Sequence, residues 1–209
     1  MQVLAAGPAP QASGGPIGQV IAAVIGNYMT SFFVLGLIVA AFQILRIRGR
    51  RDGVVVSGIL LNNFILFGIG CAQVFNFVMH SVFGDFAAQT IGWAPSPFQL
   101  ELAFSSLGVG VMAFMLYGRK SQLRAKAAIV IATVIFGFGA AGGHIYQELV
   151  NHDYAANNSG WLLVSDVLLN AVGLALLIWH AVGTRHRADV TDAAVTAGNR
   201  PARQVTTAR

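Results

Sequence analysis

The sequence predicts an all-α integral membrane protein, a helical bundle with five transmembrane helices. Of its 209 residues, 56% are hydrophobic and only 10% are charged, whereas soluble domains carry about 25% charged residues. The mean hydropathy is +0.66. The first charged side chain is Arg46, so the stretch before it exceeds the roughly 20 residues that an apolar helix needs to cross a bilayer. These observations exclude a water-soluble globular domain.

Five apolar runs are long enough to be spans. We predict them at residues 17–45, 54–83, 98–117, 127–150 and 161–182. The first run has no basic residues before it, unlike a signal peptide, so we expect it to be retained as a span. The third has the clearest start, because Ser96-Pro97-Phe98-Gln99 combines a capping hydroxyl, a proline in the first turn and a glutamine three residues after the cap. Around this membrane domain, residues 17–187, we expect a flexible outer arm over 1–16 and a disordered cytoplasmic tail over 188–209.

The positions of the basic residues indicate how the chain is oriented across the membrane. All thirteen Lys and Arg residues lie in the loops after the first and third spans or beyond the fifth span. Since short basic loops stay in the cytoplasm, the N-terminus is predicted outside and the C-terminus in the cytoplasm. The net charge of +5 is therefore explained by the membrane topology. We expect a lipid bilayer as partner and no nucleic acid. A homo-oligomer or a membrane partner subunit is left open.

Polar side chains inside the predicted spans form the candidate site. Such groups are costly in lipid, so we expect them to face protein. At 100° per residue, each of the second to fifth spans gathers its polar residues on one face. The four ionisable ones lie near the outer ends of their spans and are predicted to form one layer in the outer leaflet: His80, Glu101, His144 and Asp166. Three amides are predicted to extend this layer inward: Gln73, Asn76 and Asn170.

Three functions fit this layer. The first is to bind or conduct an ion, a proton or a small polar ligand. The second is a redox or hydrolytic protein in which His80, Glu101, His144 and Asp166 hold a divalent metal, or in which the two histidines hold a haem. The third is a non-catalytic partner or assembly subunit, in which the histidines pair with Glu101 or Asp166 and only hold the helices in register. No nucleophile and base can be placed together, so the catalytic residues, the cofactor and enzymatic activity itself are left open.

One stretch of the chain resembles a known family. It is Trp93-Ala94-Pro95-Ser96-Pro97-Phe98-Gln99-Leu100-Glu101, followed by Leu107-Gly108-Val109-Gly110 and Gly142-Gly143-His144. These motifs are similar to those of a small bacterial family of multi-pass membrane proteins of unknown function, over roughly the second to fifth spans. The resemblance implies a bacterial inner-membrane protein and places Glu101 and His144 in a common motif. It implies no activity, and the first span and the basic tail are where the chain would depart from the family pattern.

Overall fold

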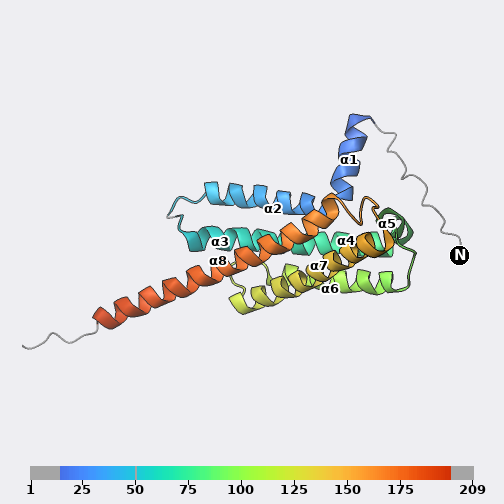
Figure 1. The fold of residues 1–209 in the computed structure, drawn as a ribbon. Coiled ribbons are helices and arrows are strands. Elements are labelled where there is room, and N and C mark those ends of the chain that lie inside the picture. The colour runs from blue at the N-terminus through green and yellow to red at the C-terminus, as the bar shows by residue number, and fades with distance from the viewer. Residues whose placement is uncertain (1–14, 50, 199–209) are drawn as a thin grey trace, which may run out of the picture.

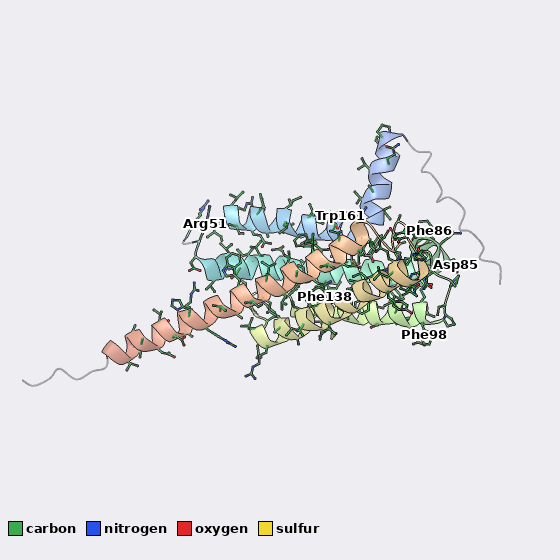
Figure 2. All side chains as sticks on the ribbon, viewed as in Figure 1. Arg51, Asp85, Phe86, Phe98, Phe138 and Trp161 are labelled. Carbon is green, nitrogen blue, oxygen red and sulfur yellow. The ribbon has the colours of Figure 1, made fainter. Side chains whose placement is uncertain are left out.

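Every regular element in the described part of the chain is helical, which confirms the all-α fold class. The structure is a computed structural model that describes residues 15–49 and 51–198. Its elements are α1 (Pro16–Gly26), α2 (Tyr28–Leu45), α3 (Gly53–Asn63), the π-helix η1 (Phe64–Cys71), α4 (Ala72–Ser81), α5 (Gly84–Ile91), α6 (Phe98–Leu116), α7 (Leu123–Asn151) and α8 (Trp161–Gly198). The long helices run side by side in an elongated bundle (Figure 1). Asp85 of α5 lies at one end and Arg51 at the other (Figure 2), and we call these the α5 end and the basic end.

Five helices are long and apolar enough to cross a membrane, as the sequence predicts. They are α2, the continuous helix Gly53–Ser81 formed by α3, η1 and α4, then α6, α7 and α8. Large apolar side chains on their outer faces are open to the surroundings, including Ile38, Met115 and Ile135. An apolar surface of this kind is energetically favourable in contact with lipid and unfavourable in contact with water. The chain is therefore a multi-pass helical membrane protein.

The first apolar run differs from the single span expected over 17–45. The helix is interrupted at Asn27, whose φ of −116° and ψ of 40° are not helical, and α1 leaves the bundle at a steep angle to α2 (Figure 1). The side chain of Asn27 donates a hydrogen bond to the carbonyl of Ala23 at 2.9 Å. Asparagine competes in this way with the regular helical pattern. Consequently only α2 of this run lies in the bundle.

The far end of the chain also differs from expectation. Helix α8 continues to Gly198, so residues 188–198, expected to be disordered, are helical. Threonines that would favour other conformations are accommodated because Thr191 and Thr196 donate to the carbonyls of Arg187 and Asp192. The rest of the predicted tail, 199–209, and residues 1–14 of the predicted arm lie outside the described residues.

A π-helix divides the second span. Hydrogen bonds from i to i+5 add residues to each turn, so η1 rotates the faces that follow it relative to those before it. Before η1, Asn62 accepts a hydrogen bond from the Gly118 amide at 3.1 Å, at the basic end. After η1, Asn76 donates to Ser106 in the middle of α6 at 2.8 Å. A face drawn at 100° per residue therefore does not continue through this span.

An apolar core fills the middle of the bundle towards the basic end. Its residues come from the second span, α6, α7 and α8: Leu61, Phe64, Ile65, Ile69, Ala113, Ile129, Val130, Val134 and Leu177. All are buried. This core separates the α5 end from the basic loops.

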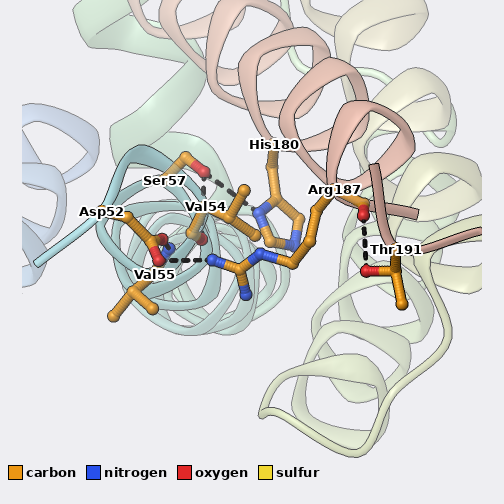
Figure 3. Close-up of polar contacts among 7 residues, drawn as sticks. All are labelled: Asp52, Val54, Val55, Ser57, His180, Arg187 and Thr191. Carbon is orange, nitrogen blue, oxygen red and sulfur yellow. Dashed lines mark hydrogen bonds and ion pairs between the residues drawn. The ribbon is translucent and has the colours of Figure 1, made fainter. Parts of the chain in front are cut away.

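Polar contacts join α3 to α8 beyond that core (Figure 3). Asp52 caps α3 by accepting a hydrogen bond from the Val55 amide at 3.0 Å, and it pairs with Arg187 at 2.5 Å. One turn further in, the Ser57 hydroxyl lies 3.1 Å from Nδ1 of His180. These contacts fix the register of the two helices at the basic end.

Candidate functional site

A cavity of about 760 Å³ lies at the α5 end of the bundle. Its walls come from the end of α1, from α2, η1, α4, α5, α6, α7 and α8, and from the loops before α6 and α8. Most of its lining residues are apolar or glycine. This size and composition are typical of small-molecule sites. Six of the seven site residues predicted from the sequence line it: His80, His144, Asp166, Gln73, Asn76 and Asn170.

Glu101 is not among the residues that line the cavity, and its side chain is exposed. It lies in the first turn of α6, where a carboxylate interacts favourably with the helix dipole. The structure therefore does not bring Glu101 into the layer expected with His80, His144 and Asp166. Among the described residues, no three His, Cys, Asp or Glu side chains gather closely enough to hold a metal ion. The metal-ligand set expected from the sequence is thus not assembled.

His80 is held by an amide and not by a carboxylate. Gln99 Nε2 donates to the carbonyl of Gly84 at 2.7 Å and lies 3.1 Å from Nδ1 of His80. Because only the nitrogen of an amide can face a carbonyl oxygen, Gly84 fixes the orientation of the Gln99 side chain. Nδ1 of His80 therefore accepts, and Nε2 carries the proton. Gln99, which the sequence places in a helix cap, serves here to join α4 and α6.

His144 is likewise held by an amide, that of Asn158. Nδ2 of Asn158 donates to the carbonyls of Asp153 at 2.8 Å and His144 at 3.3 Å. Its Oδ1 accepts from Trp93 Nε1 at 3.1 Å and lies 2.9 Å from His144 Nδ1. The Trp93 and His144 rings also lie against each other at a tilt of 33°, with centroids 5.3 Å apart. Nδ1 of His144 therefore carries a proton and donates it to Asn158.

A third set of polar contacts crosses the cavity wall from α2 to α6. The Tyr28 hydroxyl donates to Oδ1 of Asn76 at 2.5 Å, and Nδ2 of Asn76 donates to Ser106 at 2.8 Å. The Asn76 amide is thus satisfied at both ends. It belongs to the wall of the cavity and keeps no side-chain atom free for a ligand.

Asp166 and Gln73 keep polar atoms free. The Asp166 side chain is buried, with 6% of the residue exposed, and its carboxylate accepts no hydrogen bond from any described residue. His144 and Tyr28 lie near enough to interact with it electrostatically. Oε1 of Gln73 is fully buried and has no hydrogen-bond partner among the described residues. Buried polar atoms without a partner are rare in native proteins and mark places where another group binds.

The α7 and α8 helices approach closely beside these groups. A Cβ atom on Gly137 would lie 2.0 Å from Nδ2 of Asn170, so only glycine leaves room for the amide. Asn170 donates in turn to the backbone carbonyl of Asp166 at 2.6 Å. Glycine in α7 therefore positions the polar face of α8.

The expected pairing of histidines with carboxylates is not what the structure shows. Within the described ranges, the one ion pair joins Asp52 to Arg187 at the basic end, and His80 and His144 pair with amides. Sequence reasoning missed Gln99, Asn158, Tyr28 and Trp93 as site residues. Of these, Asn158 had the weakest signal, since it lies in a loop and shares no helical face with His144.

A membrane helical bundle with a largely apolar cavity and a buried carboxylate is the class of protein that these features define. The chain belongs to the family of unknown function DUF6790, whose family model matches residues 26–186. This confirms the membership in an uncharacterised family that the sequence motifs indicate. The match begins next to the break between α1 and α2 and ends in the part of α8 beside α3. It includes α2, so the expectation that the first span departs from the family pattern is wrong. No curated protein and no solved structure matches the chain.

Proposed function

We propose that this protein binds a small organic molecule in the cavity at the α5 end. The observation that carries the proposal is the buried, unpartnered Oε1 of Gln73 on the wall of a cavity of about 760 Å³. A binding site of this kind combines an apolar lining with a few polar atoms that orient the ligand. The cavity supplies both, and its remaining polar groups are held in place by His80–Gln99 and His144–Asn158 contacts.

Binding is better supported than conduction of an ion or a proton. A conducting path would continue from Gln73, Asn76 and Asn170 to the basic end, but the apolar core described above fills that part of the bundle. Charged and polar species cross such a region only at high cost. In this proposal the protein holds a ligand in the cavity, near one surface of the membrane.

We propose further that the protein lies in a bacterial inner membrane, as the resemblance of its motifs implies, and that its basic loops place the α5 end outside. With Cys71 replaced by serine, a cysteine introduced at Gln89 of α5 is expected to react with a membrane-impermeant maleimide added to right-side-out vesicles. A cysteine introduced at Gln122, before α7, is expected to stay unlabelled until the vesicles are opened. Both positions are exposed, so the reverse labelling pattern would contradict this orientation.

Filling the cavity is expected to abolish binding. Gly143 lines the cavity, and a Cβ atom there would meet nothing within 4 Å, so Gly143→Leu places a side chain in the cavity without disturbing the wall. Two probes of equal size, 1-naphthylmethylamine and 1-naphthalenemethanol, can be measured by equilibrium dialysis against protein in nanodiscs and against empty nanodiscs. We expect at least one of them to bind and to lose about tenfold or more in affinity in the variant.

The matched control is Gly108→Leu. Gly108 lies on α6, a Cβ atom there would likewise meet nothing within 4 Å, and the residue is not among those that line the cavity, so this variant should bind like the wild type. If neither probe binds above the level of empty nanodiscs, or if both variants behave alike, the cavity is not a binding site.

A further inference from the structure

The cavity has a carboxylate on its wall. Asp166 is the one acidic residue among those that line it, and no Lys or Arg is included among them. No described residue donates a hydrogen bond to the Asp166 carboxylate. Gln99 holds His80, and His144 donates from Nδ1 to Asn158 while lying near enough to interact with the carboxylate electrostatically. An ionised carboxylate inside a membrane-spanning segment is costly unless a cation pairs with it. The chemistry of the site therefore favours a positively charged ligand.

The cavity wall also carries hydrogen-bond acceptors from Tyr28 and Gln73, beside the N–H donors of His80 and of the Gln73 amide. The Tyr28 oxygen keeps its lone pairs because its proton is donated to Asn76. Oε1 of Gln73 is unpartnered. A cation that carries N–H donors can donate to these oxygens, whereas the Asp166 carboxylate repels a carboxylate or phosphate.

Aromatic and apolar residues make up the remainder of the lining. They include Phe64, Phe86, Trp93, Phe98 and Phe136. Aromatic faces attract organic cations, and apolar walls remove the hydrocarbon part of such a molecule from water. A bare metal ion would find too few ligands here, as no three suitable side chains of the described residues gather.

We propose that the ligand is a membrane-soluble organic ammonium, an amine with an apolar or aromatic body whose charged N–H group pairs with Asp166. This inference rests on the proposed function and names its ligand class. The apolar body lies against the aromatic lining, and the acceptor atoms of Tyr28 and Gln73 lie on the walls of the same cavity.

The test compares four ligands that share a naphthylmethyl body, using wild-type protein in phosphatidylcholine nanodiscs and equilibrium dialysis. They are 1-naphthylmethylamine, 1-naphthalenemethanol, 1-naphthylacetic acid and (1-naphthylmethyl)trimethylammonium. We expect the amine to bind about tenfold more tightly than the alcohol, because a charge-assisted hydrogen bond is roughly twice as strong as a neutral one and about 1.4 kcal/mol corresponds to tenfold in affinity. The acid should bind most weakly. The quaternary ion, which has the charge but no N–H, should fall between the amine and the alcohol.

Two variants compare the effect of removing the carboxylate in the cavity with that of removing a carboxylate outside it. Asp166→Asn is nearly isosteric and should remove the preference for the amine over the alcohol. Glu101→Gln removes an exposed carboxylate that does not line the cavity and should leave the preference intact. Thermal unfolding of each variant shows whether it is folded. If Asp166→Asn does not fold, the affinities of the four ligands for the wild type test the ligand class by themselves.

The possible failures are distinguishable. An alcohol or an acid that binds wild type as tightly as the amine, and that loses affinity in Gly143→Leu, would overturn the ligand class while leaving the proposed function in place. A quaternary ion that binds as tightly as the amine would overturn the role of the N–H donors. If no ligand binds the wild type in a way that Gly143→Leu weakens, the proposed function itself is wrong.

Discussion

Replacing Asn158 by alanine is expected to destabilise the α5 end of the bundle by about 2–3 kcal/mol. The side chain is fully buried and makes four hydrogen bonds, accepting from Trp93 and His144 and donating to the carbonyls of Asp153 and His144. Alanine leaves the buried partners without a hydrogen bond, and each such group costs about 1–3 kcal/mol. For a chain of this size the melting temperature should fall by roughly 4–12 °C.

Thermal unfolding in detergent micelles measures this effect, and the fluorescence of Trp93 should change at lower temperature than in the wild type because its indole N–H has lost its acceptor. The neighbouring Asn157→Ala is the control, since Asn157 contributes its backbone amide to a hydrogen bond with Thr90 and its side chain forms no hydrogen bond with the described residues. Equal melting temperatures for the two variants would show that the Asn158 contacts do not hold the loop.

Replacing Gly173 by alanine is expected to destabilise the protein by about 1–3 kcal/mol through overpacking. A Cβ atom at this position of α8 would lie 2.4 Å from Cζ and 2.5 Å from Cε1 of Phe64. The Phe64 ring has little room to move, because it is buried and its other edge faces Gly68 and the ring of Phe33. Helix α8 must therefore shift away from η1, where Phe64 lines the cavity.

A double-mutant cycle with Phe64→Leu checks this mechanism by chemical denaturation in mixed micelles. Leucine lacks the ring atoms that collide, so Gly173→Ala should cost much less in the Phe64→Leu background than in the wild type. As the control, Gly139→Ala has nothing within 4 Å of the added atom and should be neutral or stabilising by up to about 1 kcal/mol. Additive effects of the first two substitutions would rule out a collision between them.

Local features of the sequence determine the start of α6. Phe98 begins the helix, and its amide donates to the Ser96 hydroxyl at 3.3 Å, as the capping motif predicts. The Gln99 side chain, however, does not return to the cap and instead binds Gly84 and His80. A capping motif describes contacts within one turn, whereas these partners come from other parts of the chain.

The π-helix shows most clearly why the positions of polar residues were only partly predictable. The spacing of apolar residues is satisfied by an α-helix or a π-helix, so no periodicity over residues 54–83 distinguishes the two. The structure adopts η1 where α6 packs against it, and a Cβ on Gly70 would lie 2.9 Å from Phe114 of that helix. Contact between helices thus selects the local form.

The sequence by itself determined that the chain lies in a membrane, how many times it crosses, and which residues are too polar to face lipid. These properties follow from the transfer of each side chain between water and hydrocarbon, which depends on composition and order along the chain. Only the tertiary structure decided that Glu101 faces outward, that amides hold both histidines, and that Asp166 and Gln73 keep free atoms in one cavity. These outcomes depend on the rotation of each helix against its neighbours, and that rotation is set by packing between residues far apart in the sequence.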